Sequence, residues 1–503
     1  MTPAEIGTFE QQLERIERQA RAMGLDFFPV RFELVPAEVM YTFGAYGMPH
    51  RFTHWSFGKA YQRMKTQYDY NLSRIYELVI NSDPAYAFLL EGNSLLQNLV
   101  VAAHVLAHVD FFKNNRRFQH TSRTMVESMA VDAERMRAYE FTYGREAVEA
   151  ILDAALAIQD QVDPYGNPWR GPEWRDPKPK VRKAPGEHDG GAGSRQGGDP
   201  YSDLWALDRY LPGGDPRPEG NRTGAGGTAA GKEAGRAAPG GPPHRTFPER
   251  PVKDLVRFVA EESRVLEPWQ RDVLFMVRQE MLYFWPQMET KIMNEGWASF
   301  FHVRLMRSLD LSEADAVEFA RMHAGVVQPS PYSINPYLMG LKLFESIERR
   351  WNEPTLEERE RFGRRGGEGR SKIFEVRETE TDVSFLRNYL TRELVEELDL
   401  YLYAQVDGRW QVVEKDWEKV RDHLVAQLTH CGVPYIVVED GDYQGRGELL
   451  LQHRHEGLDL DARYAQKTLE HVYRLWGKPV HLATRENGKD RLHSFDGQES
   501  TVR

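Results

Sequence analysis

The spacing of apolar and polar residues divides most of the chain into amphipathic helices. Between residues 4 and 23, apolar residues recur every three or four positions, which predicts a surface helix. The same periodicity marks the segments 123–143, 145–160, 254–265, 268–283, 287–309 and 312–324. Two further segments, 71–81 and the residues after Pro84, are also expected to be helical. The chain is therefore predicted to be mainly α-helical.

The most apolar run is 91–115, EGNSLLQNLVVAAHVLAHVDFFKNN. We expect the chain to break at Glu91-Gly92-Asn93 and a new helix to begin with Ser94 as its N-cap. A break would make Glu91 a plausible neighbour of the polar groups in that helix. Because polar side chains interrupt the run, it is expected to be a buried helix and not a transmembrane segment.

Two histidines of this helix are candidate metal ligands. His104 and His108 are four residues apart, so they lie one turn apart on the same face. Two imidazoles that point the same way suit a divalent transition metal. The alternative is that each is a buried histidine with its own hydrogen-bond partner.

A second stretch, KIMNEGWASFFHVR at 291–304, offers a third ligand. Glu295 and His302 are seven residues apart and share a helix face. A carboxylate in an aromatic-rich helix is costly unless something holds its charge, and a metal bound to His104 and His108 would do so. The resulting His₂Glu set is one used by catalytic zinc sites. Alternatively, Glu295 caps a helix or pairs with an arginine.

Loops rich in aromatic, Gly and Pro residues are expected to wrap this site. His54 lies in one such segment and could be a ligand, a residue that orients a ligand, or a packed imidazole. Other candidates for the surroundings of the metal are Asn93, Lys113, Asn294, His323, Asn335 and Tyr337.

Changes in composition suggest domain boundaries. The Gly/Pro-rich stretch 164–251 is expected to be a disordered insertion, with an apolar island at 201–211 that could dock on the core or on a partner. Near the C-terminus, period-2 patterns and Asp-Gly turns predict two β-hairpins. Two amphipathic helices, 417–431 and 461–476, and a last pair of strands are expected to complete an α+β module. The predicted parts are a first helical half with the HxxxH motif (1–163), the insertion (164–251), a second helical half with NEGWA (252–352), a linker (353–373) and an α+β domain (374–503).

Composition excludes some classes of function. A formal net charge of −11 argues against a general nucleic-acid binder, which needs a basic face. The single cysteine, Cys431, rules out an intrachain disulfide and a cysteine-based zinc site. The charged N-terminal segment does not resemble a signal peptide, so a cytoplasmic protein is expected.

Several motifs in the same order resemble the SpoVR-like family (stage V sporulation protein R). They are FELVPAEVMYTFGAYGMPHRFTHWSFGK, YELVINSDP, AHVLAHVDFFKNN, TKIMNEGWASFFH, INPYLMG and HVYRLWGKPVHL. The resemblance implies a role in formation of the spore cortex, a peptidoglycan layer, or in stress responses. It also implies partners, namely a PrkA-type serine kinase and a von Willebrand-type domain protein.

The order HxxxH followed by NEG is also similar to gluzincin aminopeptidases, in which two His and the Glu of NEG hold zinc. The resemblance implies that His104, His108 and Glu295 are the ligands. Those enzymes carry a general base in the slot that Val105 occupies here. Glu91, His302 or His323 would have to supply the base, with Glu91 and His302 as the catalytic candidates.

Two functions follow from these observations. One is a zinc-dependent hydrolase of a peptide or peptidoglycan substrate. The other is a non-catalytic scaffold or regulator that acts through partners. A di-iron carboxylate protein is disfavoured, because the residues three before His104 and His302 are Val101 and Ser299 and not glutamates.

Overall fold

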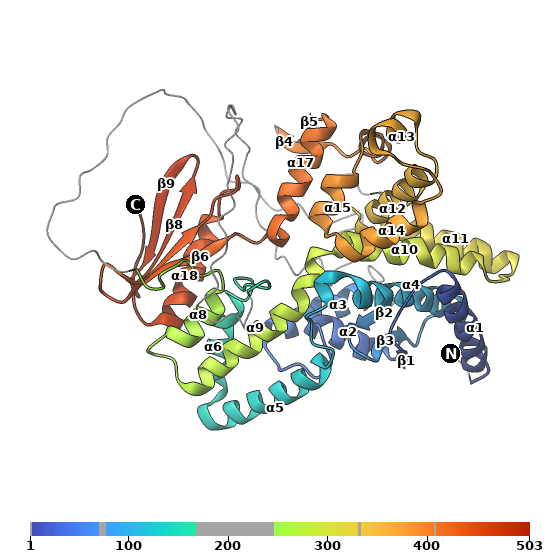
Figure 1. Cartoon of the computed structure of the whole chain (residues 1–503). Helices are drawn as coiled ribbons and strands as arrows, with labels where there is room; N and C mark the ends of the chain where they lie inside the picture. The colour runs from blue at the N-terminus through green and yellow to red at the C-terminus, as the bar shows by residue number, and fades with distance from the viewer. Residues whose placement is uncertain (1–2, 70–76, 167–245, 330–332, 407–408) are drawn as a thin grey trace.

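The computed structural model describes residues 3–69, 77–166, 246–329, 333–406 and 409–503. Most of the expected insertion, including the island at 201–211, lies outside the described residues. The described chain is mainly helical, with a sheet-rich region towards the C-terminus (Figure 1). The predicted class, mainly α with a smaller α+β part, is confirmed at that level.

A helix and a small sheet open the chain and lead to the long apolar helix. The elements before the insertion are α1 (Pro3–Ala22), β1 (Val30–Val35), α2 (Ala37–Tyr46), α3 (Trp55–Asp69), β2 (Glu77–Ile80), β3 (Ala85–Leu90), α4 (Leu95–Asn114), the 3₁₀ turn η1 (Arg116–Phe118), α5 (Met125–Tyr143) and α6 (Arg145–Leu156). The strand order is β1-β3-β2, in which β3 pairs parallel with β1 and antiparallel with β2.

The helix expected at 71–81 is wrong over its described part, where strand β2 forms, and its residues 71–76 lie outside the described residues. The helix expected after Pro84 is also wrong, because strand β3 forms there. β3 is the central strand of its sheet and is almost wholly buried. A short, fully buried strand and a buried helical segment have the same apolar pattern. Residues 85–90 form a strand because they pair with β1, which is far away in the sequence. Local periodicity does not reveal that pairing.

Helix α4 begins where the sequence predicts. The Ser94 side chain accepts a hydrogen bond from the Gln97 backbone N–H, and the Gln97 side chain accepts one from the Ser94 N–H. This reciprocal capping box fixes the start of the helix. α4 is long and apolar enough to cross a membrane, but 83% of its most apolar window is buried inside the protein. The prediction of a buried helix is confirmed.

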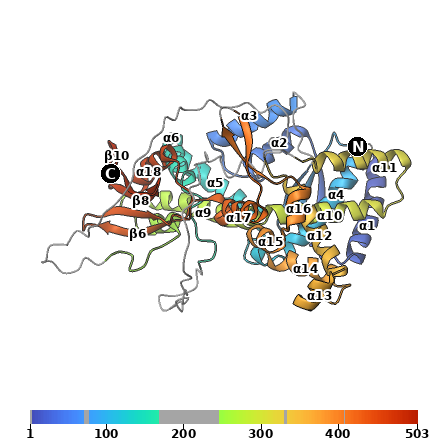
Figure 2. The ribbon, with the colours of Figure 1, turned by 90° about the horizontal axis from the view of Figure 1, so that it is seen from above.

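The elements described between the insertion and residue 397 are all helices. The elements are α8 (Leu255–Glu262), α9 (Pro268–Glu289), α10 (Lys291–Arg307), α11 (Glu313–Val326), α12 (Pro336–Asn352), α13 (Leu356–Phe362), α14 (Gly369–Thr379), α15 (Asp382–Tyr389) and α16 (Arg392–Glu397). α9 runs from the end of the molecule that holds α5 and α6 towards the centre, where α10 packs against both α4 and α12 (Figures 1 and 2).

The C-terminal hairpins form as predicted. The elements are β4 (Leu402–Val406), β5 (Arg409–Glu414), α17 (Trp417–Leu428), the 3₁₀ turn η3 (Thr429–Gly432), β6 (Ile436–Tyr443), β7 (Glu448–His453), α18 (Ala462–Trp476), β8 (Val480–Glu486), β9 (Lys489–Phe495) and β10 (Ser500–Val502). β4 and β5 pair with each other, and the other strands form a sheet of order β10-β9-β8-β7-β6.

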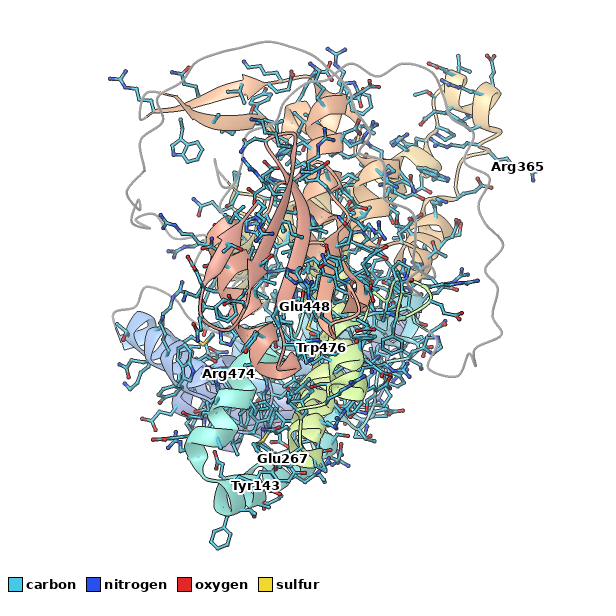
Figure 3. The ribbon with its side chains drawn as sticks, turned by 90° about the vertical axis from the view of Figure 1, so that its left-hand side faces the viewer. Tyr143, Glu267, Arg365, Glu448, Arg474 and Trp476 are labelled. Carbon is cyan, nitrogen blue, oxygen red and sulfur yellow. The ribbon has the colours of Figure 1, made fainter. Side chains whose placement is uncertain are left out.

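Helix α18 joins this five-stranded sheet to the helices beneath it. Trp476 Nε1 donates to the Gly447 carbonyl at 2.9 Å, and Arg474 Nη1 donates to the Ala150 carbonyl of α6 at 3.3 Å. Figure 3 shows both side chains at the base of the sheet, close to α6 and α8. The sheet is therefore packed on the end of the molecule that holds α6, α8 and α9.

Two large apolar clusters divide the molecule differently from the expected domains. The first contains α1, α4, α10 and α12, and it also includes Phe385 of α15 and Leu424 of α17. The second joins α6, α8, α9 and α18 to the five-stranded sheet. The expected boundary at 374 therefore falls inside the first cluster, and the expected linker 353–373 contains α13 and the start of α14. The change of core lies between Val425 and Val438.

Candidate metal centre

Helices α4 and α10 bring His104, His108 and Glu295 together. One potential ligand atom from each of the three lies within 4.8 Å of the others. Glu295 Oε2 is 3.5 Å from His104 Nε2 and 3.5 Å from His108 Nε2. Donors placed tetrahedrally around a zinc ion at its usual bond length are about 3.4 Å apart. The two measured separations therefore fit a shared divalent ion.

The cluster is shielded from water, and its protonation state suits a cation. The Glu295 side chain is 18% exposed, whereas both imidazoles are less than 10% exposed. Burial and the neighbouring His104 lower the pKa of His108 to about 4. Burial would raise the pKa of Glu295, but His104, His108 and Lys291 outweigh it and lower that pKa. At neutral pH the site therefore presents a carboxylate and a neutral His108 imidazole, the forms that bind metals.

The environment of the buried Glu295 oxygen fits a cation. Glu295 Oε2 is inaccessible to water, and no group in the described residues makes a well-formed hydrogen bond to it. A buried carboxylate oxygen without a donor is strongly destabilising unless a positive charge compensates it. A metal ion held by the three residues would supply that charge.

Partners behind the two imidazoles orient them. His108 Nδ1 is 2.9 Å from Asn294 Oδ1, which can only accept, so Nδ1 carries the proton and Nε2 turns its lone pair to Glu295. His104 Nδ1 is 2.8 Å from His302 Nδ1. When His104 presents Nε2 as a lone pair, its Nδ1–H donates to His302. Partners of this kind fix the tautomer of metal-binding histidines.

The row of imidazoles continues from His302 to His323 on α11. His302 Nε2 is 3.1 Å from His323 Nδ1, so both nitrogens of His302 are engaged. Burial and then His104 lower the pKa of His302 well below its usual range. His302 therefore lies behind the His104 ring, on the edge away from Glu295, where it orients that ring.

A close helix crossing positions Glu295. A Cβ atom added to Gly296 would lie 2.3 Å from the Gly340 backbone, and one added to Gly340 would lie 2.1 Å from the Ile292 carbonyl oxygen. α10 and α12 thus touch backbone to backbone at this point, which only glycine permits. The glycine of the NEG motif is explained by this contact and not by the chemistry of the site.

Buried carboxylates tie α10 to its neighbours. Asp382 of α15 accepts from the Ile292 and Met293 N–H groups at 2.8 and 2.9 Å, and so caps the first turn of α10. Asp110 of α4 accepts from Trp297 Nε1 at 2.8 Å and pairs with Arg377 of α14. Sequence reasoning missed both residues, because their partners lie far away in the chain.

The loop before α12 brings an aromatic ring to the site. Asn335 Oδ1 accepts from the Tyr337 and Leu338 N–H groups and starts α12, while its Nδ2 donates to the Val326 carbonyl. Tyr337 stacks on His104 with the ring centroids 6.0 Å apart. Of the surrounding residues expected from the sequence, Asn294 and Tyr337 contact the cluster and Asn335 holds Tyr337, whereas His323 contacts His302 behind it.

Four other candidates lie elsewhere. Glu91 is exposed on the turn before Ser94, and about 15 Å of helix separates that cap from His104. Asn93 donates to Asn98 Oδ1 near the same cap. Lys113 pairs with Asp26 at 2.6 Å. His54 is bonded to Ser56 and to Asp153 of α6. The structure does not bring these residues to the His/Glu cluster.

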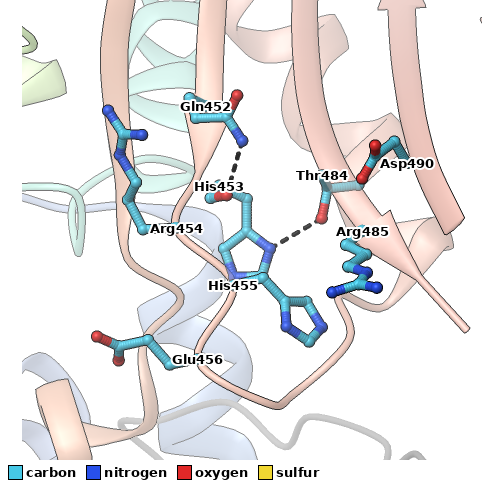
Figure 4. Close-up of a pocket in the computed structure, with 8 residues that line it drawn as sticks. All are labelled: Gln452, His453, Arg454, His455, Glu456, Thr484, Arg485 and Asp490. Carbon is cyan, nitrogen blue, oxygen red and sulfur yellow. Dashed lines mark hydrogen bonds between the residues drawn. The ribbon is translucent and has the colours of Figure 1, made fainter. Parts of the chain in front are cut away.

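A separate polar hollow of about 370 Å³ lies at one end of β7 and β8 (Figure 4). Its histidines bond within the protein: His453 Nδ1 is 2.8 Å from Thr484 Oγ1, and His455 Nε2 is 2.8 Å from Asp459 Oδ1. The hollow therefore lacks the convergent set of donors that the cluster on α4 and α10 provides.

Comparison with known proteins places the chain in a family. A family model described as "SpoVR like protein" matches residues 4–433. The chain belongs to the SpoVR-like family. A second model, "SpoVR-like C-terminal domain", matches residues 434–487, so the two models join where the apolar core changes. The Escherichia coli (strain K12) protein "Uncharacterized protein YcgB" is 29% identical over 500 residues, which cover 93% of this chain and 90% of that protein. No solved structure matches this chain.

Proposed function

We propose that this SpoVR-like protein binds one divalent metal ion, with zinc the expected ion, through His104, His108 and Glu295. The observation that carries the proposal is the buried Glu295 Oε2, which lies 3.5 Å from both Nε2 atoms and makes no well-formed hydrogen bond within the described residues. Asn294 and His302 support it by directing both imidazoles towards that oxygen.

The activity we propose is metal-dependent hydrolysis of an amide bond in a peptide or a peptidoglycan precursor. A His₂Glu centre leaves a coordination position open, and zinc bound there would polarise a carbonyl and activate water. The chain's own residues orient the ligands and exclude bulk water. This gluzincin-like activity rests on the donor set and on the order of the HxxxH and NEG motifs.

The proton acceptor distinguishes this site from those of the similar peptidases. Val105 is completely buried where the similar peptidases have a glutamate. Glu91 is exposed and away from the cluster, and His302 contacts the far edge of His104. A proton could reach His302 only through the His104 ring. We therefore expect slow hydrolysis.

The test compares zinc-loaded full-length protein with its Glu295→Gln variant on synthetic muropeptides and peptides, with products followed by mass spectrometry. New amines from the native protein, absent with Glu295→Gln and retained with the exposed-histidine control His120→Ala, are the expected result. Metal-loaded native protein that cleaves none of the substrates contradicts the hydrolase.

A second candidate is a non-catalytic scaffold or regulator with a structural metal. The buried Val105 favours this scaffold role, because His104, His108 and Glu295 can hold a metal without a catalytic base at position 105. In that case removal of zinc destabilises the fold, while the loaded protein leaves every substrate intact.

Family membership supports a sporulation-related protein. By family resemblance, we further propose a cytoplasmic role in cortex formation or stress response, with a PrkA-type serine kinase and a von Willebrand-type domain protein as partners. The buried position of α4 is compatible with that location. Binding of purified kinase to the native chain, measured by calorimetry, tests the first partner, and no heat of binding would count against it.

A further inference from the structure

A buried hydroxyl beside the proposed metal centre has no hydrogen-bond partner among the residues that the structure describes. Ser299 of α10 has no exposed surface, and no group in the described residues hydrogen-bonds its Oγ. Serine and threonine inside a helix usually bond to the carbonyl four residues earlier. Other helical hydroxyls of this chain do so: Thr42 bonds to the carbonyl of Glu38, Ser128 to that of Thr124 and Thr142 to that of Ala138. The Ser299 hydroxyl is therefore turned away from its own helix.

Its place on α10 directs it to the centre. At 100° per residue, Glu295, Ser299 and His302 fall within an arc of about 60° on the helix. On one side of this arc Asn294 contacts His108 of α4, and on the other Gly296 contacts Gly340 of α12. Ser299 thus faces the wedge between α4 and α12, and lies along the helix between Glu295 and His302.

His104 of α4 lies in the same space between α4 and α12. Its ring contacts Glu295 and His302, the residues on either side of Ser299 along α10, and it stacks on Tyr337 from α12. A polar atom that points there and finds no protein partner needs a ligand from outside the chain. Three protein ligands leave one position of a tetrahedral ion for such a ligand.

We propose that the Ser299 hydroxyl hydrogen-bonds the oxygen ligand, a water molecule or a small carboxylate, that completes the centre of His104, His108 and Glu295. This inference rests on the metal centre proposed above. It gives Ser299 the role of a ligand-binding residue whose hydrogen bond forms only when the centre is filled.

The test uses the full chain loaded with Co²⁺, whose visible spectrum reports its ligands, and acetate as the oxygen ligand. Ser299→Ala should bind Co²⁺ as the native protein does, but acetate about threefold to tenfold more weakly, which corresponds to the loss of one hydrogen bond. Unchanged acetate affinity in Ser299→Ala, or no spectral response of the native protein to acetate, overturns the inference.

A second measurement separates this role from simple packing. Without metal, Ser299→Ala should unfold at the same temperature as the native protein or higher, because it loses a hydroxyl that has no partner. The control Ser263→Ala removes a buried hydroxyl that donates to Leu475 at 2.7 Å, and should unfold at a lower temperature. An equal loss in both variants contradicts the inference. Failure of the native chain to bind Co²⁺ would instead overturn the metal centre itself, and Ser299 with it.

Discussion

Gly296 of α10 and Gly340 of α12 meet so closely that neither can carry a side chain. A Cβ on Gly296 would lie 2.3 Å from the Gly340 backbone. This contact fixes the distance between the two helices at the residue that follows Glu295. It also places α12, which carries Tyr337, close to His104. The geometry of the proposed metal centre therefore depends on a helix crossing as much as on its ligands.

Substitution of Gly296 by alanine should destabilise the protein by about 1–3 kcal/mol, because the methyl group forces the two helices apart. Metal affinity should fall as well, since Glu295 moves with the backbone. Urea unfolding and metal titration measure the two effects. The controls are Gly58→Ala on α3 and Gly325→Ala on α11, where a Cβ meets nothing within 4 Å. Both should stabilise by about 0.5–1 kcal/mol, and a Gly296→Ala variant as stable as these would refute the account of the crossing.

Asn294 should tune metal binding without holding the metal. Its Oδ1 accepts from His108 Nδ1 at 2.9 Å. Loss of such a partner typically weakens metal affinity by about 10- to 100-fold, so Asn294→Ala should bind zinc more weakly by that factor. Asn294→Asp should bind more tightly, because a carboxylate raises the basicity of the imidazole. Competition with a chelator measures both, and a shift of the two affinities in the same direction would speak against this role.

The metal-free protein should lose the stabilising effect of a neutral His108 in acid. The pKa of His108 is about 4 in the folded protein, mainly because of burial, and about 6.5 in the unfolded chain. The unfolded state therefore binds more protons between these values. The contribution of His108 to the free energy of unfolding is therefore fully present above pH ~6.5. It falls by about 3 kcal/mol as the pH drops towards 4.

Because other buried groups also titrate, the comparison is with His108→Gln in the same buffers. Relative to that variant, the native protein should become progressively less stable from pH 7.5 to 4.5 in urea unfolding. A constant difference across this range would mean that His108 is not held neutral in the fold.

Asp382 should show the opposite dependence on pH. Burial raises its pKa to about 7, although the Ile292 and Met293 N–H groups partly offset that rise. The folded state therefore holds the proton more tightly than the unfolded chain, and stability falls as the pH rises from about 4 towards 7. Relative to Asp382→Asn, which cannot ionise, the native protein should be less stable at pH 8 than at pH 5. Asp382→Ala should cost about 1–2 kcal/mol at pH 5, through the lost cap, and less at pH 8, where ionisation of Asp382 already destabilises the native protein. An Asp382→Ala variant as stable as the native protein at pH 5 would show that α10 needs no cap.

The sequence predicts the features that depend on local spacing. His104 and His108 share a helix face because they are four residues apart. Ser94 caps that helix by bonding to Gln97, only three residues further along the chain. The β-hairpins at 402–414 and 436–453 follow from period-2 patterns and short turns. The approach of Glu295 to the histidine pair was inferred from the cost of burying a carboxylate, and the structure brings the three together.

What the sequence does not reveal depends on distant partners. β3 is a strand because β1 pairs with it. Gly296 is conformationally unremarkable until Gly340 is placed against it, and Asp382 becomes a cap only when α15 meets α10. Glu91 was expected near the metal because a helix break follows it, but the turn leaves it exposed. The C-terminal boundary was placed at 374 from composition, whereas packing assigns α15 and α17 to the first core.

Elemental analysis of the purified full-length chain after zinc loading and dialysis tests the central claim most directly. The native protein and the exposed-histidine control His120→Ala should each retain close to one divalent ion per chain, and the folded His104→Ala/His108→Ala double variant should retain none. Native protein that retains no metal, or a double variant that retains as much as the native chain, would contradict the proposal that His104, His108 and Glu295 form a metal centre.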